Sequence, residues 1–480
     1  MDSAINCLTA VRLPISAATV YRQVKRPSTE QDIMEKQQTI SGFSKLSKRN
    51  KIKWIVQNFF KDPEAVAKEL TSYWLRNEEQ QKVLDGFSEN TISNFYLPYG
   101  VAPNFLINGK PYVIPMVTEE SSVVAAVSKA AKFWMQRGGF QTEILGTTKI
   151  GQVHFSWTGD IAKLKRILPA LEEQLRQAAK PITKNMDARG GGILSIELLD
   201  FSDQEPHYYQ LRASFETCDS MGANFINSVL ESFGTTLKQF VATHPIFNDS
   251  ERDLTIIMAI LSNYTPDCVV RAKVECPIES LGTINGIDAA TFAQKYYTAI
   301  RIAHIDPYRA TTHNKGIFNG IDAVILATCN DFRAIEACGH TYAAKDGQYR
   351  SLSHCTIEDG LFKFWLDIPL AVGTVGGLTK LHPVAKRSLE LLGNPDAKTL
   401  MQIIAATGLA QNFAAVRSLV TVGIQKGHMK MHLLNILNHL NASEREVKEA
   451  IVFFKDRVVS FSAVREFLEG KNAPNFQPAK

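Results

Sequence analysis

The fold class is decided by the stretch from Gly151 to Phe233, GQVHFSWTGDIAKLKRILPALEEQLRQAAKPITKNMDARGGGILSIELLDFSDQEPHYYQLRASFETCDSMGANFINSVLESF. Its strand-like runs are QVHFSW, ILSIELL and YYQLRASFET, and its helical stretches are IAKLKRILPALEEQLRQAAK and the one that begins at DSMGANFINS. The order strand, helix, strand, strand, helix predicts a small α+β unit. A doubly wound parallel sheet would need repeated strand–helix units, and no GxGxxG turn follows a strand.

A larger region of mixed helix and strand texture lies on both sides of this unit. Asn108-Gly109 between the apolar runs NFLI and YVIPMV predicts a β-hairpin. Ser121 and Ser122 precede an Ala-rich run and are candidate helix caps. Apolar spacing predicts amphipathic helices over 52–84 and further helices over 396–419 and 429–440. The chain is therefore of the α+β class.

Composition excludes several classes of protein. The 480 residues are 45% hydrophobic and 21% charged, which is ordinary for globular proteins and argues against disorder, collagen and coiled coil. The length suggests about two to four domains. Fifty-three basic and 48 acidic side chains give a net charge of +5, too weak and too scattered to predict a nucleic-acid partner.

The cysteines and the N-terminus bear on location. Seven cysteines are scattered without a CxxC pair, so we expect reduced thiols and neither a zinc ribbon nor a thioredoxin-like site. Asp2 precedes a short apolar stretch that Arg12 interrupts, which is the opposite of a secretory signal. No run approaches the roughly 18 apolar residues of a spanning helix. We expect a soluble, cytoplasmic protein whose basic first residues form a partly ordered arm.

A dense polar cluster occupies DPYRATTHNKGIFNGID, residues 306–322. It is typical of a polar surface loop. It also suits an anionic substrate, because Arg309 can bind a carboxylate through two hydrogen bonds and Lys315 can stabilise a developing oxyanion, with Asn319 close in sequence. Asp331 follows the apolar run AVILAT at a strand-to-helix turn, where aspartate is usually an N-cap.

A second candidate site begins at Asp219 and Ser220, which lead an amphipathic helix. One interpretation is a capped core helix. The other is that the small residues Gly222 and Ala223 let a phosphate or ribose approach the free N–H groups of the first turn. Two glycine runs, RGGG at 189–192 and VGTVGGLTK at 372–380, fit either a tight turn or a ligand-cradling loop.

Two histidines follow the glycines near the C-terminal end. His428 and His432 have the i, i+4 spacing of a metal pair, but the glutamate of HExxH is absent and no other ligand is evident. We therefore expect no metal. His428 after Gly427 is either a structural histidine or a mobile catalytic acid. Glu89, at the end of a polar run before TISNFYLP, carries no signal by itself.

Six strings occur in order from about Glu89 to Met429. They are ENTISNFYLPYGVAPNFLINGK, PMVTEESSVVAAVSKAAK, DSMGANFINS, DPYRATTHNKGIFNGIDAVILATCND, GTVGGLTKLHP and GLAQNFAAVRSLVTVGIQKGHM. Together they resemble 3-hydroxy-3-methylglutaryl-CoA reductase, and more closely its soluble bacterial class II branch. The segment between Gln152 and Asp219 is longer than in that branch, and the N-terminal arm lies outside the resemblance.

The resemblance implies a domain plan. A large mixed α/β substrate and CoA domain would comprise residues 51–115 and 263–421, with residues 1–50 as the arm. A small antiparallel, ferredoxin-like NAD(P)-binding domain that is not a Rossmann fold would be inserted at 116–262. Residues 422–480 would form a helical flap, with the apolar face of Leu433, Ile436, Leu437 and Leu440 docking over bound ligands. The family's homodimer, or a higher assembly of dimers, would build the active site at the subunit interface.

The resemblance also implies the reaction and its residues. Two hydrides from NAD(P)H would reduce 3-hydroxy-3-methylglutaryl-CoA through a hemithioacetal and mevaldehyde to mevalonate and free coenzyme A. The matching residues are Glu89, Lys315, Asp331 and His428 for catalysis, Arg309 and Asn319 for substrate, and Asp219, Ser220, Met221, Gly222, Ala223 and Asn224 for the cofactor. Glu89 would exchange a proton with the carbonyl oxygen, which burial would favour. Asp331 would hydrogen-bond the lysine and the glutamate, and His428 would protonate the thiolate.

Other functions stay open at this point. A dehydrogenase of another small hydroxy acid would need a GxGxxG unit, and a non-catalytic nucleotide- or CoA-binding homologue would have lost the catalytic residues first. The sequence leaves open the physiological direction and the choice between NADPH and NADH, with NADPH favoured. Lys149 is a candidate partner for a 2′-phosphate.

Overall fold

The computed structural model describes residues 39–379, 381–421, 423, 433–455 and 457–471. The chain forms two compact units, Met1–Phe95 and Tyr96–Lys480. The predicted segment 51–115 spans the division between them, and the four-part domain plan stays a prediction.

Short helices make up the described part of the first unit. They are η1 (Phe43–Lys45), α2 (Lys48–Phe59), α3 (Pro63–Ser72) and α4 (Glu78–Asp85). Ser47, Asp62 and Asn77 each accept a hydrogen bond from a backbone N–H of the first turn that they cap. The amphipathic helices predicted over 52–84 are confirmed, although α2 starts inside the stretch assigned to the arm.

The second unit opens with the predicted hairpin, β1 (Tyr99–Ile107) and β2 (Lys110–Val117). Asn108 and Gly109 both have positive φ, 48° and 79°, which is the conformation that a two-residue hairpin turn requires. Helix α5 (Val123–Met135) follows. Ser122 occupies its N-cap position, but with φ 76° its side chain makes no capping hydrogen bond, so the predicted serine cap is wrong.

An antiparallel sheet of order β3-β8-β10-β9 lies at the centre of this unit. Its strands are β3 (Gln141–Ile144), β8 (Val269–Pro277), β9 (Ser353–Glu358) and β10 (Leu361–Pro369). The helices with it are η3 (Ile278–Leu281), α9 (Ala289–Ile305), α10 (Pro307–Ala327), α11 (Phe332–Ala343), η4 (Gly377–Thr379), α12 (Pro383–Leu391) and α13 (Ala397–Val420). Their apolar side chains form one continuous core with those of β1, β2 and α5, and this core includes Trp134, Tyr296 and Phe413.

The loop interpretation of residues 306–322 is wrong, because they form α10. Asp306 caps this helix through the N–H of Tyr308, and Pro307 stands at its first position. Gly320 in this stretch and Gly408 in α13 lie where the two helices approach closely. A Cβ on Gly320 would come within 2.9 Å of the Thr407 carbonyl oxygen of α13, and a Cβ on Gly408 within 2.8 Å of Ile321.

Helix α13 is the one described helix long and apolar enough to cross a membrane. Its apolar window is 72% buried, and it packs against α10 and α5 in the core. Burial by protein explains this composition, since a helix that is apolar on all sides is typical of the core of a large domain.

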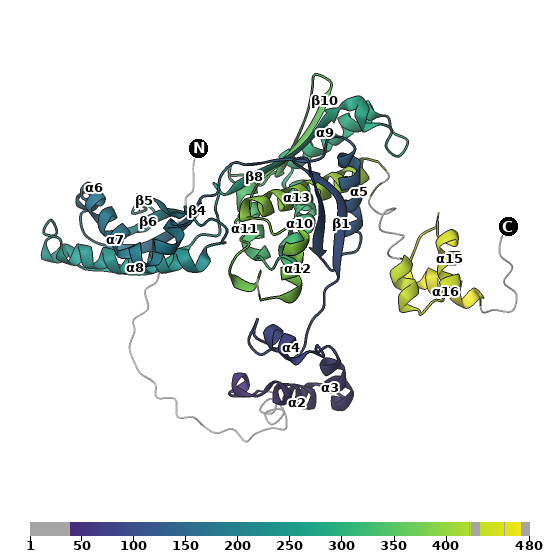
Figure 1. Ribbon diagram of the computed structural model, residues 1–480, viewed down its shortest axis with the longest axis horizontal. Helices are drawn as coiled ribbons and strands as arrows, with labels where there is room; N and C mark the ends of the chain where they lie inside the picture. The colour runs from purple at the N-terminus through teal and green to yellow at the C-terminus, as the bar shows by residue number, and fades with distance from the viewer. Residues whose placement is uncertain (1–38, 380, 422, 424–432, 456, 472–480) are drawn as a thin grey trace, which may run out of the picture. The chain divides into compact units, whose positions relative to one another are not determined.

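The small α+β unit predicted from residues 151–233 is confirmed as an antiparallel sheet with helices. It consists of β4 (Lys149–Trp157), α6 (Ile161–Arg166), α7 (Leu168–Asp187), β5 (Gly192–Asp200), β6 (Tyr208–Glu216), α8 (Ala223–Thr243), η2 (Asp249–Glu251) and β7 (Leu254–Leu261). The strand order β5-β6-β4-β7 is that of a ferredoxin-like unit. Helices α7 and α8 lie side by side against the sheet (Figure 1). A core of its own, with Phe155, Leu171 and Phe233, separates this unit from the large sheet.

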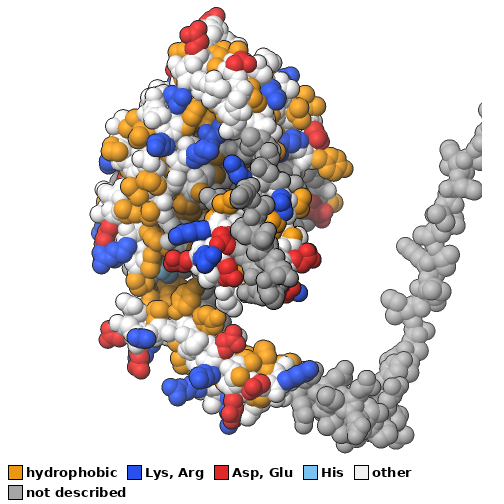
Figure 2. All heavy atoms as spheres, turned by 90° about the vertical axis from the view of Figure 1, so that its right-hand side faces the viewer, with side chains coloured by type: hydrophobic (Ala, Val, Ile, Leu, Met, Phe, Trp, Pro, Cys, Tyr) orange, Lys and Arg blue, Asp and Glu red, His pale blue; other side chains and the backbone are white. Residues whose placement is uncertain are grey.

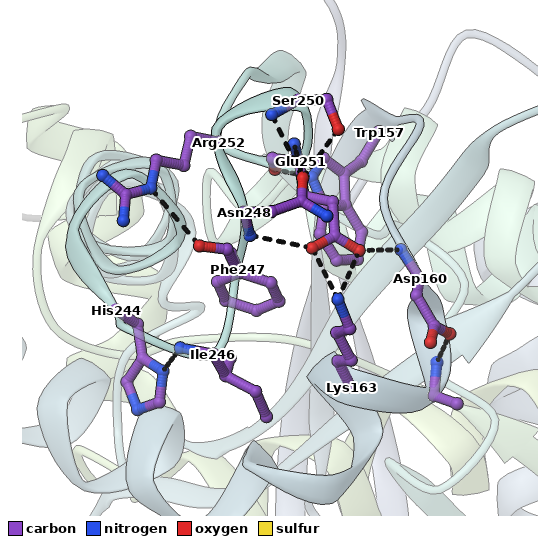
Figure 3. Close-up of polar contacts among 11 residues, drawn as sticks. Trp157, Asp160, Lys163, His244, Ile246, Phe247, Asn248, Ser250, Glu251 and Arg252 are labelled. Atoms are coloured by element: carbon purple, nitrogen blue, oxygen red, sulfur yellow. Dashed lines mark hydrogen bonds and ion pairs between the residues drawn. The ribbon is translucent and has the colours of Figure 1, made fainter.

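A buried carboxylate joins three elements of the small unit (Figure 3). Glu251, 8% exposed, accepts hydrogen bonds from Lys163 Nζ at 2.7 and 2.9 Å, from Asp160 N at 3.2 Å and from Asn248 N at 3.0 Å. The Trp157 indole N–H donates to the Glu251 carbonyl oxygen. The Lys163 ammonium and these N–H donors lower the pKa of Glu251. The cluster therefore fastens the end of β4 to α6 and η2.

The C-terminal helices form a core of their own. Residues 433–439 are helical and are followed by α15 (Glu444–Phe453) and α16 (Phe461–Lys471). Leu433, Ile436 and Leu437 are buried in a cluster with Phe454 and Phe467, and Leu440 packs against it. The predicted apolar face is therefore already covered by its own segment and does not await a ligand-dependent surface. The segment carrying His428 and His432 lies outside the described residues.

Two sequence expectations concern surface and thiols. Lysine, arginine, aspartate and glutamate side chains are interspersed on the face shown in Figure 2, which agrees with the weak net charge. The described cysteines are free thiols, namely Cys218, Cys268, Cys276, Cys329, Cys338 and Cys355. Cys7 lies outside the described residues.

Candidate active site

A lysine and a glutamate from distant parts of the sequence meet beside α10. Lys315 Nζ lies 2.7 Å from Glu120 Oε2, and Asn319 Nδ2 donates to the same oxygen at 3.3 Å. Lys315 and Asn319 are four residues apart and share one face of the helix. Glu120 follows β2, so the hairpin carries it to α10. The side chains of Lys315 and Glu120 are 60% and 38% exposed, so both are accessible to a ligand.

A second carboxyl group, that of Asp322, lies on α10 itself. Asp322 is three residues beyond Asn319, and one of its oxygens, Oδ1, is buried without a hydrogen-bond partner among the described residues. Burial raises the pKa of Asp322 to about 8, and the neighbouring carboxyl groups of Glu336 and Glu119 act in the same direction. The site of Asp322 therefore favours the protonated carboxyl group.

Asp331 is the predicted N-cap, and the structure confirms it at the start of α11. Its Oδ1 accepts from the N–H groups of Arg333 at 3.1 Å and Ala334 at 3.2 Å, and its carboxylate pairs with the Arg333 guanidinium. Burial alone would raise the pKa of Asp331, but these donors lower it below its ordinary value. The hydrogen bonds expected from Asp331 to lysine and glutamate stay a prediction.

The residues predicted to bind the cofactor form a tight turn before α8. Gly222 is the N-cap with φ 94°, and a Cβ there would meet Thr217 Cγ2 at 2.5 Å, so the position requires glycine. No side chain caps the first turn of α8. Its first N–H groups have no intrahelical partner, which suits the phosphates of a dinucleotide.

Asp219 ties this turn to the large domain. Its Oδ1 accepts from Ala397 N, the first residue of α13, at 2.9 Å. Its carbonyl oxygen accepts from Thr374 N at 2.9 Å and Val375 N at 3.3 Å. A Cβ on Gly373 would come within 2.5 Å of Met221 N. Residues 373–375 of this glycine run are thus packed against the turn.

Comparisons with known proteins identify the family. The family model described as hydroxymethylglutaryl-coenzyme A reductase matches residues 49–433. The chain belongs to the hydroxymethylglutaryl-coenzyme A reductase family. It is 36% identical over 438 residues to the 3-hydroxy-3-methylglutaryl-coenzyme A reductase of Archaeoglobus fulgidus, covering 90% of this chain and 94% of the relative. A probable reductase of Borreliella burgdorferi is 32% identical, with 89% and 91% covered.

Solved reductase structures are similar as well. A 3-hydroxy-3-methylglutaryl-coenzyme A reductase from Streptococcus pneumoniae is 35% identical and has a TM-score of 0.64. The similarity covers 90% of this chain and 100% of the streptococcal chain. A class II reductase from the same organism, bound to NADPH in open conformations, is 36% identical and has a TM-score of 0.64. This similarity covers 80% of this chain and 100% of the streptococcal chain. The resemblance inferred from the six strings is confirmed.

Within this reductase, the structure brings together only some of the predicted site residues. Lys315 and Asn319 meet at Glu120, which the sequence interpretation missed. The signal was present, because Glu119-Glu120 directly follows a strand in PMVTEESS. Glu89 lies in the unit Met1–Phe95 and is exposed, so the burial expected for it is not observed. His428 lies outside the described residues.

Two neighbours on α10 have different surroundings. Arg309 is half-buried, and burial lowers its pKa. It precedes Lys315 by six residues, about 240° around the helix, and therefore lies on another face. His313 is buried with Nε2 2.7 Å from Ser353 Oγ. Burial lowers the pKa of His313 to about 3, followed by the charges of Arg309 and His304, so this histidine is neutral.

The other glycine run is a turn with no sign of a ligand site. RGGG is the turn between α7 and β5, where Gly190 and Gly192 have φ of 85° and 120°. In the part of the chain that the structure describes, no three His, Cys, Asp or Glu side chains are grouped to hold a metal ion.

Proposed function

We propose that this chain interconverts 3-hydroxy-3-methylglutaryl-CoA and mevalonate at a site centred on Lys315 and Glu120. The observation that carries the proposal is the 2.7 Å contact between Lys315 Nζ and Glu120 Oε2, with Asn319 at the same oxygen. A cation, a carboxyl group and an amide donor on accessible side chains are what two successive carbonyl reductions need. Membership of the reductase family supports the identity of the substrate.

Lys315 stabilises the oxygen of the substrate carbonyl. When a carbonyl carbon accepts a hydride, its oxygen gains negative charge, and a fixed ammonium close to that oxygen lowers the barrier. Lys315 lies on a helix packed against α13, so the position of its backbone is fixed. The same group serves the thioester and the aldehyde steps, because both reductions build charge on an oxygen at the same place.

Glu120 takes the proton-transfer role that the sequence assigned to Glu89. It lies 2.7 Å from Lys315 Nζ, so an oxygen held by the lysine is within reach of the same carboxyl group. In the aldehyde step, a protonated Glu120 gives its proton to the carbonyl oxygen and becomes a carboxylate, which the ammonium stabilises. Asn319 donates to Glu120 and holds its orientation.

Other roles rest on the family resemblance. Asp331, at the start of α11, would orient the lysine and glutamate. His428 would protonate the coenzyme A thiolate as it leaves. Arg309 would bind the substrate carboxylate. Because Arg309 lies on another face of α10 than Lys315, the substrate would have to extend around the helix.

A nicotinamide cofactor, when bound, supplies the hydride. The residues that would hold it are Asp219, Ser220, Met221, Gly222, Ala223 and Asn224, with the uncapped first turn of α8 facing its phosphates. We infer a preference for NADPH, which the similar streptococcal structure binds. A homodimer with interfacial active sites, a cytoplasmic location and a C-terminal flap are further parts of the proposal.

The test is the loss of reduced-nicotinamide absorbance with the CoA thioester and, separately, with free mevaldehyde. We expect two reduced cofactors consumed per thioester and one per aldehyde. Oxidation of the cofactor with other small oxo acids, but with neither of these substrates, would overturn the proposal.

His428→Gln refines the assay. Only the thioester step expels a thiolate, so this variant should lose thioester reduction much more than mevaldehyde reduction. Equal losses on both substrates would assign His428 a structural or cofactor-gating role.

A further inference from the structure

Lys149, the first residue of β4, is buried beneath the turn that precedes α8. The residue is 5% exposed. Its Nζ donates to the Ser220 carbonyl oxygen at 3.1 Å and to Thr217 Oγ1. Thr217 Oγ1 in turn donates to the same Ser220 oxygen at 2.7 Å. All of the ammonium's described hydrogen bonds are therefore with the turn itself, and Lys149 lacks the exposed position that a phosphate-binding lysine would need.

Burying an ammonium is unfavourable, so its retention here calls for a reason. Burial lowers the pKa of Lys149, and neighbouring Cys268, Glu216, Cys218 and Asp219 act in the opposite direction. Glu216 is itself held by Thr147 and by Cys218 N at 2.8 Å. The negative charges of Glu216 and Asp219 thus partly offset the unfavourable burial of the ammonium.

The turn needs such a tie because its backbone is strained. Cys218 has φ 49°, which is unfavourable for a residue with a side chain, and Gly222 has φ 94°. Between these two positions, Asp219 is held by Thr374, Val375 and Ala397 of the large domain. The carbonyl oxygen of Ser220 accepts a hydrogen bond from Lys149 Nζ. The turn is therefore fixed from both domains immediately before the first N–H groups of α8.

We propose that Lys149 is a positioning residue for the cofactor: it holds the turn Thr217–Gly222 in the shape that presents the first turn of α8 to the dinucleotide phosphates. This replaces the expectation that Lys149 contacts a 2′-phosphate. The inference rests on the proposed function, because the turn that Lys149 supports belongs to the cofactor site proposed for that enzyme. It requires that Lys149 act equally on NADPH and NADH, because both carry the pyrophosphate.

The experiment measures the dissociation constants of NADPH and NADH for the full-length protein by fluorescence titration. Lys149→Met keeps the bulk of the side chain and removes its charge and donors. We expect both dissociation constants to rise by a similar factor, about tenfold or more, as for the loss of a hydrogen bond from a charged group. The KM for the thioester should change little, and Lys149→Arg should recover part of the affinity.

Lys163→Met is the matched control in the same domain. Lys163 binds Glu251 beyond the far end of β4, and eight residue steps of strand from Lys149 to Trp157 span about 26 Å. This variant should lower the melting temperature and leave both dissociation constants unchanged. A similar loss of cofactor affinity in Lys163→Met would mean that general damage to the domain, and not the turn, explains Lys149→Met.

Thr217→Val serves if Lys149→Met does not fold. Valine keeps the methyl contact with Gly222 and removes Oγ1, which bonds both Lys149 and Ser220. A smaller but equal weakening for NADPH and NADH supports the proposal. A loss confined to NADPH, or no loss for either cofactor, overturns it. A wild-type protein that binds neither cofactor would instead contradict the proposed function.

Discussion

Two lysine–glutamate pairs in this chain have the same Nζ–Oε2 distance of 2.7 Å and very different surroundings. In the pair of Lys163 and Glu251, the glutamate side chain is 10% exposed, and backbone N–H groups of Asp160 and Asn248 occupy its remaining acceptor positions. In the pair of Lys315 and Glu120, the side chains are 60% and 38% exposed, and the other described donor is Asn319.

The difference indicates which pair is structural and which is functional. Lys163–Glu251 has the buried, fully hydrogen-bonded form that joins elements of a fold. Lys315–Glu120 is an exposed pair of the kind that contributes little to stability, at most about 1 kcal/mol. Both of its partners keep accessible positions for a substrate oxygen. Distance alone would not separate the two pairs, whereas burial and the number of donors do.

The largest expected effect follows from removing each lysine. Lys315→Ala should lower thioester turnover by about 10²-fold or more, because the developing oxyanion loses its cation, and should leave the melting temperature nearly unchanged. Lys163→Ala should do the reverse, with a lower melting temperature and normal turnover per folded molecule. Steady-state kinetics and thermal unfolding of both variants check this. Near-normal turnover in Lys315→Ala would contradict the assignment of Lys315–Glu120 as the functional pair.

The second prediction separates Glu120 from Glu89. Glu120→Gln keeps the shape of the side chain and removes its ability to exchange a proton, so mevaldehyde reduction should fall by roughly 10²-fold, as is typical for loss of a general acid. Glu89→Gln is the matched control and should retain most activity. If the two variants show the opposite pattern, the sequence-based assignment of Glu89 is right.

The third prediction concerns the pH dependence of the structural pair. Because the folded-state pKa of Glu251 is lowered, its ionised form stabilises the fold above the ordinary glutamate pKa of 4.5, and this stabilisation is lost as pH falls through the folded value. Glu251→Gln should therefore unfold at a lower temperature than wild type at neutral pH. The gap should narrow in acid. A difference in melting temperature that stays constant over pH would mean that packing, and not the charge of Glu251, causes it.

The fourth prediction concerns Asp322, on the same helix as Lys315. Its folded-state pKa is raised to about 8 from 3.8, so it favours the fold fully below pH 3.8, and wild type loses this stability progressively up to about pH 8. Asp322→Asn does not titrate. Its melting temperature relative to wild type should therefore rise between about pH 4 and 8 and then level off. A difference that does not vary with pH would mean that Asp322 is ionised throughout.

Local chemistry was sufficient where a few neighbouring residues set the conformation. Asn108 and Gly109 predict their hairpin because both tolerate positive φ. Asp331 predicts its N-cap because a carboxylate there accepts free N–H groups. The order of strand-like and helical runs was likewise enough to predict the small α+β unit. The six ordered strings were enough to predict the family, and that resemblance implied the antiparallel sheet.

Packing overruled local signals at α10. The polar, glycine-containing stretch 306–322 is typical of a loop when it is considered alone. It is helical because Gly320 and Gly408 allow α10 and α13 to approach closely and bury the apolar side of α10. The sequence shows the glycines but not the helix that faces them.

The sequence by itself determined the class of fold, the family and the lysine of the candidate site, because each follows from the order of residue types along the chain. Tertiary structure alone decided that Glu120 meets Lys315 and that Lys149 is buried under the turn it supports. The physical reason is separation: Glu120 and Lys315 are 195 residues apart, and Lys149 and Ser220 are 71 apart. Contacts over such distances depend on how sheets and helices pack, and no local pattern encodes them.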